Sequence, residues 1–227
     1  MDVKRKAASG ALKFVKSGMV LGLGSGSTAA IFVDLLGEEI KKGRLKDIVG
    51  VCTSEATLKQ AKKLGIAVSS LDEQEKLDLA VDGADEVDPD MQLIKGLGRA
   101  LLREKMVEIH AEKFVVIVDR SKMVDKLGTK GPLPVEIVSF GYKSTLRFLS
   151  SLDGCRAEHW LEDDGSPAKT DNGNFLVKLW FDGGIDDPRG LAHILEARPG
   201  IVAHGLFLDM ASAVVVGDDS DVSVVEK

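Results

Sequence analysis

The sequence is poor in the residues that cross-link small secreted domains or bind metal ions. Its 227 residues include two cysteines and four histidines. Cys52 and Cys155 lie far apart with no Cys-x-x-Cys spacing, so we expect reduced thiols in a cytoplasmic protein. The histidines show no His-Glu-x-x-His or other paired spacing, and no Gly-x-Ser-x-Gly elbow is present. These absences argue against a metal site and against a serine-based catalytic triad.

A basic excess and a long apolar run are also missing. The net charge is -6, which gives no global signature of nucleic-acid binding. No apolar segment approaches the roughly 20 residues that span a bilayer, and charges interrupt the N-terminal segment, which excludes a signal peptide. With 44% hydrophobic residues the chain can still build a sizeable core. We therefore expect a cytoplasmic protein with no nucleic-acid or membrane partner.

Strands and helices alternate over about the first 120 residues. This order predicts an α/β fold with a mainly parallel, doubly wound sheet. The predicted helices are 3–15, 29–40, 57–64 and 99–110, and the predicted strands are 19–23, 48–52, 66–69, 77–81 and 114–118. A last strand at 213–216 is expected to return to the same sheet.

The pattern changes at the run Gly131-Pro-Leu-Pro134. Beyond it the predicted order is strand 135–138, helix 142–152, strands 155–161 and 174–181, helix 188–197 and strand 201–208. A β-α-β-β-α-β order resembles a small ferredoxin-like α+β unit. The sequence thus predicts a main domain of residues 1–130 and 209–227, and a smaller inserted domain of residues 131–208.

A glycine- and hydroxyl-rich loop, Gly24-Ser-Gly-Ser-Thr28, connects a predicted strand to a helix. Glycines let a ligand approach the backbone, and a helix start offers free N–H groups with a positive dipole. The hydroxyls favour a phosphate monoester. Two alternatives stay open: a dinucleotide loop of the form G-x-G-x-x-A, for which Glu55 is a loose candidate for the ribose-binding acid, and a purely structural turn.

The densest group of candidate catalytic residues lies between Asp82 and Glu104. Asp82 follows a predicted buried strand, and ligands of open α/β sheets bind beyond such strand ends. Asp82-Gly-Ala-Asp85 can be a plain turn with a capping carboxylate, but it can also supply acids for proton transfer. Glu86, Asp88 and Asp90 are interpreted as a solvated turn, and their spacing lacks the last ligand of a calcium loop.

Lys95 and Glu104 complete this group. Lys95 precedes Gly96-Leu-Gly98 at a helix start, where its ammonium can contact a phosphate, a carboxylate or an enolate oxygen. Glu104 falls between apolar pairs of the predicted helix. It can be a surface residue paired with a neighbouring cation, or it can lie at the edge of the buried face, where desolvation suits a carboxylate to act as a base.

Together these segments resemble the type A ribose-5-phosphate isomerase family. The motifs match in order over nearly the whole chain: G-L-G-S-G-S-T-A-A at 22–30, V-D-G-A-D-E at 81–86, L-I-K-G at 93–96, R-E-K at 103–105, F-V-V-I-V-D-R-S-K at 114–122, K-L-G at 126–128, P-L-P-V-E at 132–136 and T-D-N-G-N at 170–174. The resemblance implies a Rossmann-like domain with a small α+β domain, which agrees with the predicted order of elements.

The resemblance also implies an activity. It is the interconversion of D-ribose 5-phosphate and D-ribulose 5-phosphate through an enediol(ate), in the non-oxidative pentose phosphate pathway, with no metal and no cofactor. Glu104 matches the general base, and Asp82, Asp85 and Lys95 match the other catalytic residues. A homodimer or homotetramer is implied, with the small domain as lid or subunit contact. The matching substrate-contact positions are Ser25, Gly26, Ser27, Thr28, Gly83, Ala84, Gly96, Leu97, Gly98, Lys122 and one N-terminal basic residue, for which Lys4 aligns best among Lys4, Arg5 and Lys6.

One position departs from the family pattern. The family usually has three consecutive glycines after the lysine, whereas this chain has Gly96-Leu97-Gly98. A leucine is costly at a positive φ angle. We therefore expect Leu97 to adopt an ordinary conformation with its side chain turned away, and Gly98 to take the strained position.

Overall fold

The computed structural model describes residues 2–227 and divides the chain into two compact units. The first unit contains the chain up to Ala84, then Arg103–Lys122 and Asp209–Lys227. The second contains Asp85–Leu102 and Met123–Leu208. The second unit ends at Leu208, and the domain bounds expected from the sequence stay a prediction. Residues 85–102 and 123–130, which were expected in the main domain, group with the second unit.

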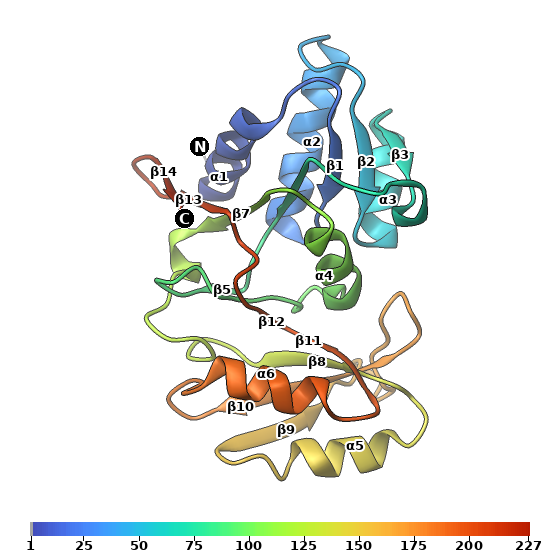
Figure 1. Ribbon diagram of the computed structural model, residues 1–227, viewed down its shortest axis with the longest axis vertical. Helices are drawn as coiled ribbons and strands as arrows, with labels where there is room; N and C mark the ends of the chain where they lie inside the picture. The colour runs from blue at the N-terminus through green and yellow to red at the C-terminus, as the bar shows by residue number, and fades with distance from the viewer. Residues whose placement is uncertain (1) are drawn as a thin grey trace. The chain divides into compact units, whose positions relative to one another are not determined.

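The first unit is built on a seven-stranded sheet in the order β14-β13-β7-β4-β1-β2-β3 (Figure 1). All neighbouring pairs are parallel except β13 and β14. The mainly parallel, doubly wound sheet is thus confirmed, and β13 returns to it as predicted. The strands are β1 (Val20–Leu23), β2 (Val49–Cys52), β3 (Ala67–Ser69), β4 (Leu79–Asp82), β7 (Phe114–Asp119), β13 (Ala213–Gly217) and β14 (Val222–Glu226).

Polar side chains cap the N-terminal ends of two helices in this unit. Asp2 accepts a hydrogen bond from the Lys4 amide, and Ser54 accepts one from the Thr57 amide. Such bonds satisfy amides that have no partner inside the helix. The helices are α1 (Val3–Ala11), α2 (Ser27–Lys41), α3 (Glu55–Lys63) and α4 (Leu101–Ile109), with short 3₁₀ turns η1 (Leu12–Phe14), η2 (Leu71–Glu73) and η3 (Arg120–Lys122).

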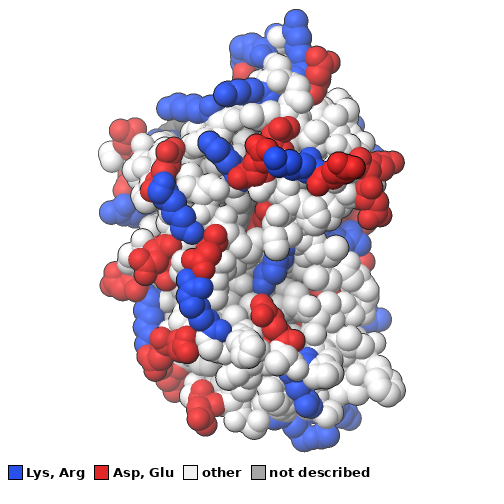
Figure 2. All heavy atoms as spheres, viewed as in Figure 1, with Lys and Arg blue, Asp and Glu red and all other residues white. Residues whose placement is uncertain are grey.

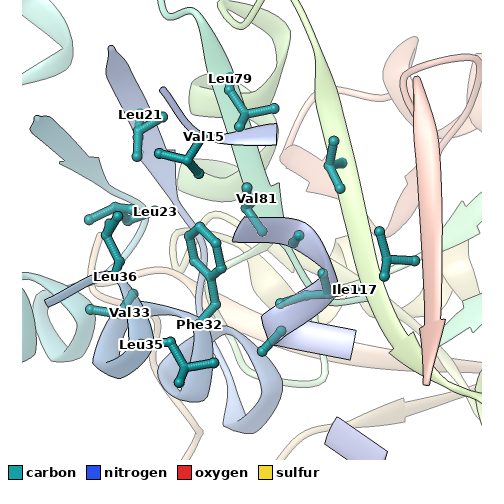
Figure 3. Packing of buried hydrophobic residues seen from close by; sticks show 14 of the residues in the cluster. Val15, Leu21, Leu23, Phe32, Val33, Leu35, Leu36, Leu79, Val81 and Ile117 are labelled. Carbon is teal, nitrogen blue, oxygen red and sulfur yellow. The ribbon is translucent and has the colours of Figure 1, made fainter. Parts of the chain in front are cut away.

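In the core of the first unit, buried side chains pack α2 against β1 and β4. Phe32 of α2 is fully buried, and Figure 3 shows it close to Leu23 and Val81 among the packed side chains. Side chains alternate across a strand, so Gly22 faces the other side of the sheet, where Val107 of α4 packs in the space that a Cβ would fill. This packing fixes the carboxyl ends of β1 and β4 beside the first turn of α2.

The second unit contains a four-stranded antiparallel sheet in the order β11-β8-β10-β9. Its elements follow the predicted β-α-β-β-α-β order, which is confirmed. They are β8 (Leu133–Ile137), α5 (Tyr142–Leu149), β9 (Cys155–His159), β10 (Phe175–Phe181), α6 (Pro188–Glu196) and β11 (Ile201–His204). Both helices pack on the sheet through one apolar cluster that includes Leu149 and Leu195.

The prediction of one continuous strand at 201–208 is wrong. After β11 the chain changes sheets at Gly205, and β12 (Leu206–Phe207) joins β6 (Leu93–Ile94) and β5 (Glu86–Val87) in a three-stranded sheet. Gly205 donates to the Pro134 carbonyl and accepts from the Lys95 amide, at 2.8 and 2.9 Å. A Cβ at Gly205 would lie 2.2 Å from the Lys95 carbonyl oxygen, so only glycine fits this crossing.

Glu86 was interpreted as part of a solvated turn, and this is wrong. Its side chain is 2% exposed and accepts three backbone hydrogen bonds, from Gly128 at 2.6 Å, Lys130 at 2.8 Å and Gly131 at 2.9 Å. The donors follow more than forty residues later in the chain, so local sequence gave no sign of them. Asp88 does form a local turn, because it accepts from the amides of Asp90 and Gln92.

The surface charges are mixed in sign. On the face drawn in Figure 2, acidic and basic side chains alternate, and no continuous basic surface is visible. Across residues 2–227, no helix is both long and apolar enough to cross a membrane.

Candidate functional site

In the first unit, the Gly24–Thr28 loop presents the beginning of α2. Gly26 is the N-cap, with φ 95° and ψ 177°, and no side chain caps the helix. Gly26 and Ser27 are exposed, and Thr28 is half-buried. An N-terminal turn of this kind offers amide donors and a partial positive charge to an anion. Ser27 and Thr28 add two hydroxyl groups beside those amides.

Ser25 belongs to a different part of the loop. Its hydroxyl lies 2.7 Å from the hydroxyls of both Thr53 and Ser54, and 3.3 Å from that of Thr57. Thr57 in turn donates to the Gly24 carbonyl at 2.9 Å. The Ser25 side chain therefore ties the loop to the segment after β2. Sequence reasoning missed this hydroxyl cluster, whose only sign was the polar run that follows that strand.

Asp82 ends β4 directly against this loop. It is 1% exposed, and its Oδ1 accepts from the amides of Ser25 at 2.9 Å and Gly83 at 2.7 Å. A Cβ at Gly24 would lie 2.1 Å from the Asp82 carboxylate. The close approach of strand and loop therefore needs glycine at position 24. Gly83 and Ala84 continue from this strand end and are half-buried.

Gly24→Ala is expected to weaken binding of a phosphorylated ligand, because either the loop or the Asp82 carboxylate must move away from the new methyl group. The KM for a sugar phosphate should rise about 10-fold or more, because even a small displacement of ligand-positioning groups costs this much. Steady-state kinetics check this. Gly43→Ala is the control, since a Cβ at Gly43 meets no atom within 4 Å although its φ of 71° adds strain. Equal KM values in the two variants would contradict the prediction.

The N-terminal basic residues have separate partners. The Lys4 Nζ donates to the Ser27 Oγ at 2.9 Å, which brings this ammonium to the loop. Arg5 pairs with Glu38 at 3.8 Å, and Lys6 donates to the Asp218 carbonyl at 2.9 Å. Of the three candidates, the structure therefore brings Lys4 to the first turn of α2.

Glu104 and Lys122 also belong to the first unit. Glu104 lies in the first turn of α4 and is 3% exposed, so the alternative of a surface residue is wrong. Glu108, one turn later on the same side of the helix, is buried to the same degree, and sequence reasoning did not single it out. Lys122 is half-buried at the end of η3, directly after β7.

In the second unit, Lys95 is buried at the end of β6. It is 2% exposed, and its Nζ lies 5.4 Å from the centroid of the Phe207 ring. The Lys95 amide donates to Gly205, and the Leu97 amide donates to the Asp85 carboxylate at 2.9 Å. The Asp85 backbone is fixed as well, through its amide to the Ile94 carbonyl at 2.8 Å. The structure thus brings Asp85 and the lysine loop together.

The conformation of the lysine loop is partly as predicted. Leu97 has no positive φ angle, and its side chain extends toward Gly131. The expectation that Gly98 takes the strained position is wrong. Positive φ angles occur instead at Gly96 (108°) and Arg99 (66°). Leu101 packs where a Cβ of Gly96 would lie, so glycine is needed at 96 for two reasons, and α4 begins at Leu101 instead of the predicted residue 99.

The cysteines do not contribute a nucleophile. Cys52 and Cys155 are free and half-buried, and burial raises the pKa of both thiols to about 11. The reactive thiolate is therefore scarce at neutral pH. No group of three or more potential metal ligands was found within the described part of the chain.

A family model described as ribose 5-phosphate isomerase A (phosphoriboisomerase A) matches residues 49–221. The chain belongs to this family. Its relatives in the isomerase A family include "Probable ribose-5-phosphate isomerase 2" of Arabidopsis thaliana, which is 48% identical over 100% of this chain and 87% of the relative. "Ribose-5-phosphate isomerase A" of Roseiflexus castenholzii is 49% identical over 97% of this chain and 94% of the relative.

Solved structures of the isomerase A family have the same fold. The enzyme of Methanocaldococcus jannaschii has a TM-score of 0.93 at 40% identity, covering 100% of this chain and 99% of that one. The enzyme of Plasmodium falciparum has a TM-score of 0.95 at 33% identity, with 100% and 99% covered. A further ribose-5-phosphate isomerase, solved in complex with phospho-erythronic acid, has a TM-score of 0.95 at 42% identity, with 100% and 98% covered.

The dinucleotide alternative for the Gly24–Thr28 loop finds little support in the first unit. A cavity of about 650 Å³ does lie beside β2, and Glu55 lines it. Glu55, however, pairs with Arg103 at 2.9 Å. Its carboxylate is therefore already engaged by a guanidinium, which disfavours the ribose contact that a dinucleotide fold requires.

Proposed function

We propose that this chain interconverts D-ribose 5-phosphate and D-ribulose 5-phosphate through an enediol(ate), with Glu104 as general base. The observation that carries the proposal is the burial of Glu104, 3% exposed in the first turn of α4, in a member of the isomerase A family. An aldose–ketose conversion moves one proton between neighbouring carbons. A single carboxylate that faces both carbons can take the proton from C2 and return it to C1.

The remaining proton and charge movements concern the two oxygens. While the proton is on Glu104, the substrate is an enediol(ate) with negative charge on oxygen. We assign the stabilisation of this charge to the Lys95 ammonium, because a buried cation interacts strongly with developing charge. Asp82 and Asp85 are assigned to the proton that moves between the hydroxyl and carbonyl oxygens. Backbone amides restrain the orientation of both carboxylates, since Asp82 accepts from Ser25 and Gly83 and Asp85 accepts from Leu97.

The phosphate group of the substrate is assigned to the first turn of α2. Its donors are the amides after Gly26, the hydroxyls of Ser27 and Thr28, and the ammonium of Lys4. Lys122 is assigned a further ionic contact, as the family resemblance implies. Contacts to this non-reacting group supply binding energy that orients the sugar for proton transfer. Ser25 acts indirectly, by holding the loop through its hydroxyl cluster.

An isomerase assay tests the proposal. The purified chain is incubated with ribose 5-phosphate and excess EDTA, and formation of ribulose 5-phosphate is followed. We expect turnover that chelation does not change, because the proposed steps use only side chains of this chain. A chain that binds the sugar phosphate without converting it would be a sensor, and thermal stabilisation by NAD would favour a dehydrogenase. Loss of turnover with EDTA would contradict the metal-free mechanism.

The expected homodimer or homotetramer stays a prediction. The second unit exposes several large apolar side chains that a subunit contact could cover, including Phe140 at 91%, Leu161 at 49% and Ile194 at 46%.

A further inference from the structure

Arg99 has an unusual backbone conformation for a residue with a side chain. Its φ angle is 66°, in the left-handed region, and its amide donates to the Gly96 carbonyl at 2.9 Å. A Cβ atom makes this conformation unfavourable unless the surrounding structure compensates for it. The strained residue lies four positions after Lys95 and two before the first residue of α4. Besides this backbone hydrogen bond, the contacts of the Arg99 side chain can compensate for the strain.

The Arg99 side chain is held from two directions within the second unit. Its guanidinium forms a two-pronged pair with the Glu162 carboxylate, Nη1 to Oε1 at 2.5 Å and Nη2 to Oε2 at 3.1 Å. The same guanidinium lies 5.1 Å from the centroid of the Trp160 ring. A planar, two-pronged pair and an aromatic face together fix the orientation of a guanidinium, which a lysine could not reproduce.

Both partners of Arg99 are themselves fixed. Trp160 packs against an apolar cluster that contains Leu101 and Leu176. Glu162 closes a tight turn, because its amide donates to the Ser166 carbonyl at 2.8 Å and its carbonyl accepts from Gly165 at 2.9 Å. The contact therefore joins Arg99 to the hydrogen-bonded turn that follows β9.

The described backbone hydrogen bonds of the lysine loop include those from the Lys95 amide to the Gly205 carbonyl and from the Leu97 amide to the Asp85 carboxylate. Both act through the backbone and lie before Gly98. The Arg99 side chain supplies a further tie after Gly98, at the point where the chain turns into α4. The Arg99 amide also bonds to the Gly96 carbonyl across the exposed Gly98, and loss of the side-chain tie would let Arg99 relax toward an ordinary conformation and weaken that bond.

We propose that Arg99 is a positioning residue, whose contacts with Glu162 and Trp160 maintain the left-handed turn and thereby fix the Lys95 loop for catalysis. This rests on the role proposed for Lys95. Arg99 acts through the loop and is assigned no contact with substrate. A merely structural ion pair on the protein surface would affect stability alone and would contribute little even there.

Three variants separate these possibilities. Arg99→Ala removes the side-chain contacts and keeps the Cβ strain, so we expect kcat to fall about 10- to 100-fold, as for small misplacements of catalytic groups. Arg99→Gly removes the contacts but tolerates a positive φ angle, so its kcat should lie between those of Arg99→Ala and the unaltered chain. Arg99→Lys should resemble Arg99→Ala, because its ammonium cannot form the two-pronged pair. The KM should change less than kcat in all three.

Arg156 provides a matched control in the same unit. It pairs with Glu158 at 3.3 Å and lies 5.4 Å from the Trp180 ring centroid, so it combines the same three residue types away from the lysine loop. Arg156→Ala should leave kcat unchanged. If Arg99→Ala and Arg156→Ala have the same kcat, the positioning role is wrong.

Amide hydrogen exchange of residues 96–99 tests the same proposal without an activity assay. Exchange in this segment should be faster in Arg99→Ala than in the unaltered chain at a temperature where both are folded, and unchanged in Arg156→Ala. Unchanged exchange in Arg99→Ala overturns the positioning role. Absence of isomerase activity in the unaltered chain would instead overturn the proposed function, so the two failures are distinguishable.

Discussion

Glu104→Gln should lower kcat about 10²- to 10⁴-fold, the range that general acid–base catalysis usually contributes. Glutamine preserves the size of the side chain and its capacity for hydrogen bonds, but it cannot accept the C2 proton. The phosphate contacts proposed above lie on the α2 turn and do not involve Glu104, so the KM should stay within a few-fold of its original value. Initial rates at several ribose 5-phosphate concentrations measure both quantities.

The control for this variant is Glu112→Gln. Glu112 is exposed in the same unit and pairs with Lys76. This variant should keep full activity. Substrate-induced thermal stabilisation of Glu104→Gln should also persist, which would show that the binding surface is intact. Near-normal turnover in Glu104→Gln would remove the proposed base from the mechanism.

Lys95→Met is expected to lower kcat about 10²- to 10³-fold, the loss typical when a preorganised group that stabilises an oxyanion is removed. Methionine is long and apolar, so it can keep the packing against the Phe207 ring while removing the ammonium. In the proposed mechanism, negative charge develops on the substrate oxygen only as the C2 proton is removed. The loss should therefore appear in kcat more than in KM.

Lys126→Met is the control for the loss of an ammonium in the second unit. Lys126 is paired with Asp186 near the surface, and this variant should keep both kcat and KM. A sharper comparison comes from 2-deuterated substrate. If Lys95 stabilises the enediolate, proton removal should limit the rate of Lys95→Met, and its isotope effect should be at least as large as that of the unaltered chain. An isotope effect near one, with a large rise in KM, would assign Lys95 to binding.

The strands of each unit determine where the candidate site residues of that unit lie. In the first unit, one parallel sheet orders the carboxyl ends of β1 and β4, which places Asp82 against the Gly24–Thr28 loop. In the second, the short β5-β6-β12 sheet fixes Asp85 and Lys95. Asp82 and Asp85 are three residues apart in the chain, yet they belong to different units. Asp82 is therefore held by the strands of the first unit, and Asp85 and Lys95 by those of the second.

The sequence by itself determined the two kinds of architecture and most of the candidate residues. Alternating apolar runs and helical periodicity are local signals, so the mainly parallel sheet and the β-α-β-β-α-β order could be predicted from them. Glycine next to hydroxyl residues at the beginning of α2, and acids after β4, are also local signals. These signals are sufficient to predict Gly26, Ser27, Thr28 and Asp82 as candidate site residues.

Only the tertiary structure decided which of these groups are available to a ligand and which support the fold. The burial of Glu86 depends on amides from residues 128–131, and the Ser25 hydroxyl is engaged by residues after β2. The left-handed Arg99 and its contacts with Glu162 and Trp160 depend on a turn more than sixty residues later. No local pattern specifies such distant partners, because they meet only when the strands that carry them have paired and packed.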